Sequence, residues 1–160
     1  MQAPRSDMHL ASRRRNVQEA RAISKNPPEG VTLAPDENNM QLWRCVVDGP
    51  DDTPYAGGKF RIDFRVPSDY PLNPPTATFK TRIFHPNVHF KTGEVCMDIL
   101  KTAWTPAWTL LSVAQAVWSI LAEPNADSPL NCDAGNLIRC NDHKGYYSIA
   151  RMYTVEHALP

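Results

Sequence analysis

Hydrophobic and polar residues alternate most strictly at positions 59–66. Every second side chain there is apolar, namely Phe60, Ile62, Phe64 and Val66. The side chains between them are charged, namely Lys59, Arg61, Asp63 and Arg65. This period of two predicts a half-buried antiparallel strand. Alternation at 42–47 and a weaker pattern at 76–80 predict further strands, and glycines at 49, 57 and 58 mark the turns between them.

Apolar residues recur at helical spacing after the predicted strands. A helix is expected to start near Thr109 and to end before Pro124, with one apolar face: Leu110, Val113, Val117, Ile120 and Leu121. We interpret it as the central helix of the core. Two shorter amphipathic segments follow, near 133–140 and 142–157. One helix, then strands, then helices is the element order of an α+β fold.

The helix before the strands is expected from about Ser6 to Lys25, capped by Ser6 or Asp7 and stopped by Pro27-Pro28. Its apolar stripe is thin: Leu10, Val17, Ala20 and Ile23. Its basic residues are numerous: Arg13, Arg14, Arg15, Arg21 and Lys25. A solvated helix face is the favoured interpretation of these charges. A docking surface for an acidic partner is the alternative.

Composition narrows the class of protein. The chain has 160 residues, which fits one domain spanning 1–160. Lys+Arg and Asp+Glu both number 17, so no net field attracts nucleic acid or an anionic membrane. The longest apolar stretch, 107–122, contains four polar residues and is too short for a bilayer, which needs about 20 apolar residues. We therefore expect a soluble protein that reaches membranes only through a partner.

Four cysteines are candidates for chemistry: Cys45, Cys96, Cys132 and Cys140. No Cys-x-x-Cys pair is present, so a zinc site is disfavoured and no metal is expected. Without a secretory signal, free thiols in a reducing compartment are expected. From the residues alone, Cys96 is more often a small buried hydrophobe than a nucleophile. A cysteine hydrolase would need His85 or His89 as its base.

The segment around Cys96 is the most informative part of the chain. It reads His85-Pro86-Asn87, then a loop with Gly93, then Cys96-Met97-Asp98-Ile99-Leu100. Other short motifs accompany it in order: the Gly49-Pro50 turn, Tyr70-Pro71-Leu72 with Pro74-Pro75, Trp104-Thr105-Pro106-Ala107-Trp108, Glu123-Pro124-Asn125 and Ser128-Pro129-Leu130. Together they resemble the ubiquitin-conjugating enzyme family over about 13–157. The resemblance implies that family's fold: an N-terminal helix, a four-stranded antiparallel sheet, a central helix and two C-terminal helices.

The resemblance also implies roles for individual residues. Cys96 accepts ubiquitin from an activating enzyme as a thioester and passes it to a target. Asn87 either donates a hydrogen bond to the oxyanion or holds the loop in shape, and Asp98 helps to orient the acceptor. His85 and Pro86 are structural residues near the active site, and His89 is expected at the surface. No cofactor is implied, because the activating enzyme uses the ATP and ubiquitin is the covalently carried substrate.

Two departures from the usual family pattern are present. Family members often carry an acidic residue where this chain has Ser128, and Cys96 comes nine positions after Asn87, one more than in most members. A carboxylate there would help to deprotonate a lysine acceptor. We therefore hypothesise an unusual acceptor, a thiol in place of lysine. The longer loop and the segment around Ser128 are similar to the peroxisomal, peroxin-type branch of the family.

That branch implies a specific setting. The target is the peroxisomal import receptor, ubiquitinated on a cysteine to support its recycling in matrix protein import. The enzyme is peripheral at the cytosolic face of the peroxisomal membrane, held by a membrane-anchored peroxin, and otherwise cytoplasmic. A guess for the anchor surface is 131–142. Rival interpretations are a conjugating enzyme for another pathway or ubiquitin-like modifier, an inactive scaffold of the same fold, and a cysteine hydrolase.

The resemblance to the family also implies which residues contact partner proteins. The activating enzyme and RING-type ligases compete for the first helix and two loops: Arg13, Arg14, Arg15, Leu72, Pro106, Ala107 and Trp108. For Trp108, core packing at the start of the central helix is equally well supported. Cys45, Cys132 and Cys140 are interpreted as structural.

Overall fold

A computed structural model describes residues 5–96 and 98–160. Within these residues, five helices accompany one four-stranded sheet. In chain order the elements are α1 (Arg5–Lys25), β1 (Val31–Pro35), β2 (Leu42–Asp48), β3 (Lys59–Arg65), β4 (Thr76–Phe79), α2 (Asp98–Ala103), α3 (Leu110–Ala122), α4 (Cys132–Arg139) and α5 (His143–His157). The α+β class and the family fold expected from the sequence are confirmed.

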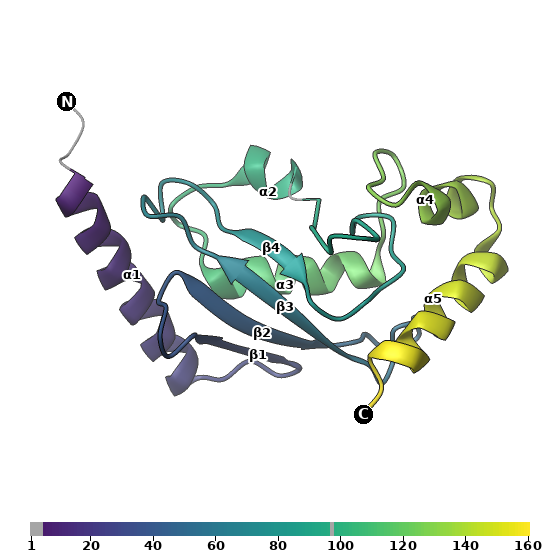
Figure 1. The fold of residues 1–160 in the computed structure, drawn as a ribbon, viewed down its shortest axis with the longest axis horizontal. Helices are drawn as coiled ribbons and strands as arrows, with labels where there is room; N and C mark the ends of the chain where they lie inside the picture. Colours follow the sequence, from purple (N-terminus) through teal and green to yellow (C-terminus); the bar gives the residue numbers. More distant parts are fainter. Residues whose placement is uncertain (1–4, 97) are drawn as a thin grey trace.

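The sheet is an antiparallel meander in the order β1-β2-β3-β4. Helix α3 packs against it, α1 lies at one end of the molecule, and α4 and α5 lie at the other (Figure 1). The register pairs Val47 with Phe60 and Ile62 with Phe79, so the apolar faces of three strands coincide. The predicted apolar face of β3 is confirmed, because Phe60, Ile62 and Phe64 are fully buried.

One charged residue of β3 departs from the alternating pattern. Asp63 belongs to the outward face, yet only 7% of it is exposed. Arg44 lies 3.4 Å from its carboxylate and Lys80 lies 3.9 Å away, one on each neighbouring strand or its extension. Cations from β2 and from the extension of β4 therefore cover the Asp63 carboxylate, and these ion pairs connect β3 to its neighbours on the outer face of the sheet.

Helix α1 buries a different face from the one predicted. Leu10 and Val17 are 53% and 38% exposed, whereas Ser12, Asn16 and Glu19 are buried. Asn16 Nδ2 donates to the Ser12 carbonyl, and its Oδ1 accepts a hydrogen bond from the indole of the fully buried Trp43. The expected apolar stripe is wrong at Leu10 and Val17, because the partner of α1 in the core offers an indole N–H that requires a polar acceptor.

The buried carboxylate of Glu19 connects three parts of the fold. It accepts hydrogen bonds from Arg15 Nε at 2.7 Å, from the Tyr70 hydroxyl at 2.5 Å and from the backbone N–H of Leu110 at 2.8 Å. The last bond places a negative charge at the N-terminus of α3, where the helix dipole favours it. Arg15 also donates to the Trp108 carbonyl, so α1 is bonded to the segment that begins α3.

Two elements were not located by the sequence patterns. The segment 82–105 was expected to be a loop, but it contains the six-residue α2 directly after the Cys96 region. β1 was implied by the family fold without being placed; its alternation of buried Val31 and Leu33 with exposed Thr32 and Ala34 carries the same signal as β3 over fewer residues. The predicted start of α3 is confirmed, with Thr109 as its N-cap.

Candidate active site

The segment from His85 to Cys96 is a loop that folds back on itself and onto the sheet edge. The Cys96 N–H donates to the Asn87 carbonyl at 2.8 Å, and Val88 faces Val95 in an antiparallel bridge. The returning leg continues the sheet, because Glu94 bridges Thr78 of β4 and the Val95 N–H donates to the Ala77 carbonyl. The backbone of Cys96 is therefore positioned from two sides, and its side chain is half-buried.

Gly93 allows this loop to approach β4. Its carbonyl accepts from the Phe79 N–H, and its φ is +77°, in the left-handed region that favours glycine. A β-carbon at this position would lie 2.1 Å from the Phe79 carbonyl oxygen. Any side chain at position 93 would therefore push the returning leg away from the strand that holds it.

His89 closes the turn of the longer loop. Its Nδ1 accepts hydrogen bonds from the backbone N–H groups of Lys91 and Thr92, and its carbonyl accepts from Gly93. His89 lies at the surface as expected; its side chain is half-buried and also serves as an internal cap for the turn.

His85 braces the start of the loop from inside the core. Its Nδ1 accepts from the Asn87 N–H at 3.0 Å, and its Nε2 lies 2.6 Å from the Ile120 carbonyl in α3. These partners require the neutral tautomer with the proton on Nε2. Complete burial lowers the pKa of His85 to about 4. Both ring nitrogens are thus occupied, and His85 cannot serve Cys96 as a base.

The depressed pKa of His85 predicts a pH-dependent stability. Between pH 6.5 and about 4, His85 is protonated in the unfolded chain but remains neutral in the folded chain. The free energy of unfolding should therefore fall by about 3 kcal/mol as pH drops through this window, and the loss is complete below it. Denaturant unfolding measures the free energy of unfolding of the wild type and of His85→Gln at each pH. The difference between the two proteins should shrink by that amount as the pH falls. His9→Gln, on the exposed face of α1, should keep the wild-type dependence.

Asn87 joins the loop to the segment that follows α3. Its Nδ2 donates to the Asn125 carbonyl at 2.7 Å, and its Oδ1 accepts from the Asn125 N–H at 2.9 Å. The neighbouring Pro86 carbonyl accepts from Leu130 N–H and Asn131 N–H. These four bonds hold the segment 125–131 beside the loop that carries Cys96. Of the two roles expected for Asn87, these bonds display the bracing one, and the oxyanion role stays a prediction.

The remaining expected site residues lie at the rim. Asp98 is exposed at the first turn of α2, two positions after Cys96. Ser128 is exposed in the 125–131 segment, and Asp127 beside it is exposed as well. Met97, between Cys96 and Asp98, lies outside the described residues. The chain thus carries an acidic side chain on the α2 side of the thiol and a hydroxyl on the loop braced by Asn87.

The four thiols differ sharply in environment. Cys45 is buried in β2, and burial raises the pKa of its thiol to about 12, so it is held neutral and inert. Cys132 and Cys140 are exposed at the two ends of α4. The expectation that these two are structural is therefore wrong, and only Cys45 fits it. Among the described residues, no group of three or more potential metal ligands gathers.

The expected partner residues form two groups. Arg13, Arg14, Pro106 and Ala107 are exposed, and Leu72 is 64% exposed. Arg15 and Trp108 instead belong to the fold: Arg15 holds Glu19 and the Trp108 carbonyl, and the half-buried Trp108 ring packs beside Trp104. Within the described residues, no helix is long and apolar enough to cross a membrane.

Comparison with known proteins decides the family. The model of the family described as "Ubiquitin-conjugating enzyme" matches residues 15–154, which is most of the chain. The chain belongs to the ubiquitin-conjugating enzyme family. This membership confirms the expected enzyme class, and it places the protein among enzymes that work with ubiquitin, an activating enzyme and ligases. A cysteine hydrolase is excluded, in agreement with the occupied nitrogens of His85.

Individual relatives of this ubiquitin-conjugating enzyme span nearly its full length. It is 50% identical to "Protein PEROXIN-4" of Arabidopsis thaliana over 152 residues, covering 94% of this chain and 97% of the relative. It is 52% identical to "Ubiquitin-conjugating enzyme E2 pex4" of Dictyostelium discoideum, covering 88% and 95%. The solved E2 domain of a Toxoplasma gondii ubiquitin conjugating enzyme superposes with a TM-score of 0.83 at 33% identity, covering 91% and 98%.

Proposed function

We propose that this enzyme carries ubiquitin as a thioester on Cys96 and transfers it to the peroxisomal import receptor, on a cysteine, in support of receptor recycling. The observation that carries the peroxisomal part is the similarity to the two relatives named peroxin-4 and pex4, at 50% and 52% identity over nearly whole chains. The half-buried Cys96 supports the thioester, because its N–H donates to the carbonyl of Asn87 in the His85-Pro86-Asn87 motif.

Transfer requires two exchanges at one carbonyl. The Cys96 thiolate attacks ubiquitin's terminal carbonyl on the activating enzyme; a new S–C bond forms and the activating enzyme's thiolate leaves. The acceptor thiolate then attacks the same carbonyl, negative charge develops on its oxygen, and Cys96 leaves as thiolate. Asn87, whose Oδ1 and Nδ2 are fixed by Asn125, can direct its second N–H to that oxygen. Asp98, at the exposed start of α2, orients the acceptor.

Ser128 bears on which acceptor is favoured. An ordinary lysine has a pKa of about 10.4, whereas an ordinary cysteine has a pKa of about 8.5. A far larger fraction of a thiol is therefore ionised at neutral pH without help from a base. The exposed hydroxyl of Ser128 cannot take a proton from an amine as a carboxylate would. Serine at this position therefore lowers the rate of transfer to a thiol less than it lowers the rate of transfer to an amine.

The proposal extends to partners and location. The exposed Arg13 and Arg14 of α1, Leu72, and the loop at Pro106 and Ala107 form the surface for the activating enzyme and RING-type ligases. The enzyme needs no cofactor of its own. A membrane-anchored peroxin holds it at the cytosolic face of the peroxisome, and it is otherwise cytoplasmic. The near balance of basic and acidic residues, 17 of each, supports attachment through this partner over direct attraction to lipid.

The test is thioester charging followed by discharge. The enzyme is incubated with ubiquitin, ATP and activating enzyme, and the adduct is then exposed to free cysteine or free lysine. We expect discharge onto cysteine to dominate more strongly than in a family member with an acidic residue at the Ser128 position. Ser128→Asp should raise the lysine rate by about tenfold or more. Ser148→Asp, an identical change on the exposed face of α5, should leave both rates unchanged.

Each outcome addresses a separate part of the proposal. No adduct with ubiquitin would overturn conjugation itself, and an adduct only with another modifier would reassign the pathway. A lysine rate that Ser128→Asp does not raise would reject the acceptor preference while leaving conjugation intact. A charged enzyme that does not modify a purified import receptor in the presence of its ligases would reject the peroxisomal target.

A further inference from the structure

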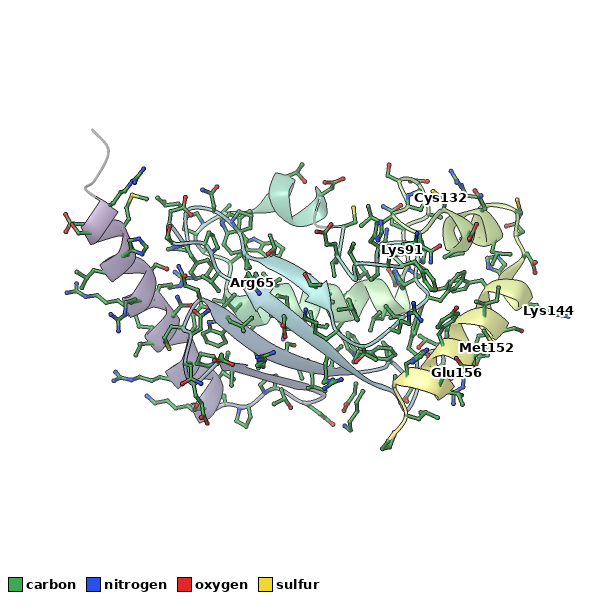
Figure 2. The ribbon with its side chains drawn as sticks, viewed as in Figure 1. Arg65, Lys91, Cys132, Lys144, Met152 and Glu156 are labelled. Atoms are coloured by element: carbon green, nitrogen blue, oxygen red, sulfur yellow. The ribbon has the colours of Figure 1, made fainter. Side chains whose placement is uncertain are left out.

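A polar cavity of about 380 Å³ is lined in part by residues 88–93 of the active-site loop. Its walls come from β3, the end of β4 with the residues after it, the turn 88–93 and the last residue of α5. Six basic side chains line it: Arg61, Lys80, Arg82, His89, Lys91 and His157. Figure 2 shows Lys91 of this turn between the sheet and the two C-terminal helices. Four of them are arginine or lysine, and in a chain with no net charge this is a local concentration of positive charge.

No carboxylate is among the residues that line this cavity. Two acidic groups next to lining residues already have partners: Asp63 pairs with Arg44 and Lys80, and Glu156 lies 3.6 Å from His157. Within residues 5–96 and 98–160, no carboxylate lies within 4.0 Å of the charged groups of Arg61, Arg82 or Lys91. Three cations thus share one hollow without counter-charges, an arrangement whose mutual repulsion an anion would relieve.

The cavity is built on fixed backbone. The Arg61 carbonyl accepts from the N–H groups of Lys80 and Thr81, and the Arg61 N–H donates to the Thr81 hydroxyl. On the opposite wall, His89 caps the turn that carries Lys91. The Arg82 guanidinium lies 5.4 Å from the centroid of the Phe90 ring, which restricts its position. The backbone that carries these side chains is therefore fixed before any ligand arrives, and only the long side chains must be ordered on binding.

We propose that this cavity binds a compound or headgroup bearing several phosphates. Arginine forks match phosphate oxygens with paired hydrogen bonds, and lysine adds a point charge. The volume falls within the range of small-molecule sites, about 300–1,000 Å³. The site is separate from ubiquitin transfer, so the proposal stands or falls independently of the proposed function. A ligand in this cavity contacts the turn 88–93, and the chain runs from this turn through Gly93 and Val95 to Cys96. The bound ligand therefore lies against the active-site loop.

Binding of inorganic tripolyphosphate to the uncharged enzyme tests this inference. Calorimetry gives its affinity, and amide chemical shifts of Thr92 and Gly93 locate it. The double variant Arg61→Gln/Lys91→Gln should weaken binding by about 100-fold or more, since it removes two charge-assisted hydrogen bonds. Arg65→Gln/Lys144→Gln removes the same charge from exposed sites outside the cavity and should change affinity less than about threefold at physiological salt.

A second arm distinguishes the source of the phosphates. Phosphatidylcholine vesicles are prepared with and without phosphatidylinositol bisphosphate. Binding to the phosphoinositide vesicles that tripolyphosphate displaces would identify a lipid headgroup; binding of tripolyphosphate alone would identify a soluble phosphate compound. Either result supports the site. Equal weakening by both double variants, shifts that avoid Thr92 and Gly93, or no measurable binding of tripolyphosphate and of both vesicles would overturn it. Ubiquitin charging of both double variants reports that they are folded.

Discussion

Replacing Cys96 by serine is expected to abolish ubiquitin transfer while leaving a slow adduct that reducing agent does not release. Serine forms an oxygen ester with ubiquitin's terminal carboxyl group, and an alkoxide is a much poorer leaving group than a thiolate, so the second exchange stops. Gel electrophoresis with and without reductant measures this change directly: the wild-type adduct disappears on reduction and the Cys96→Ser adduct persists.

The other exposed thiols supply the control for this prediction. Cys132→Ser and Cys140→Ser remove thiols that are more exposed than Cys96 and that lie at the two ends of α4, outside the His85–Cys96 loop. Both variants should charge and discharge at the wild-type rate. If either one loses the reducible adduct while Cys96→Ser retains it, the carrier has been assigned to the wrong cysteine.

Asn87→Ala is expected to slow transfer by about 10²–10³-fold, the size of effect found when a donor is removed from an oxyanion site. The substitution also deletes the two hydrogen bonds to Asn125, at 2.7 and 2.9 Å, and so frees one end of the 125–131 segment. Single-turnover discharge of the pre-charged enzyme onto free cysteine isolates the transfer step from charging by the activating enzyme.

Hydrogen exchange separates the two roles of Asn87. If bracing dominates, the Leu130 and Asn131 amides, whose bonds to the Pro86 carbonyl do not involve the substituted side chain, should exchange faster in Asn87→Ala in parallel with the loss of rate. If oxyanion binding dominates, the rate should fall while these two amides stay protected. Asn125→Ala is the matched control, because its backbone N–H and carbonyl, which bond Asn87, are retained and only a local bond to Asp127 is lost. A wild-type transfer rate in Asn87→Ala would exclude both roles.

Much of the fold was predictable because its strands and central helix are amphipathic. The alternation through Phe60, Ile62 and Phe64 indicates β3 directly, and the spacing from Leu110 to Leu121 indicates α3. Amphipathic periodicity does not predict the buried face of α1, because polar side chains pack there. Asn16 accepts a hydrogen bond from the Trp43 indole, and Glu19 accepts one from the backbone N–H at the N-terminus of α3. Polar burial depends on partners far along the chain, so local periodicity cannot reveal it.

The sequence named candidate residues for the site but could not give their geometry. Motif order singled out Cys96 and Asn87, whereas the Asn87–Asn125 bonds join positions 38 residues apart that no spacing relates. The capping role of His89 was missed because it depends on a turn whose shape the sequence does not display. Arg15 was expected to face partners, yet its side chain bonds Glu19 and the Trp108 carbonyl within the protein.

The position of Arg15 also sets limits on how this enzyme can evolve. Arg13 and Arg14 are exposed, so mutation can reset the charge that α1 presents to partners without touching the core. Arg15 supports a buried carboxylate, and its loss leaves Glu19 without the cation that pairs with it. Sequence drift at the first two arginines is thus expected to spare folding, whereas drift at the third is expected to be restricted by its cost in stability.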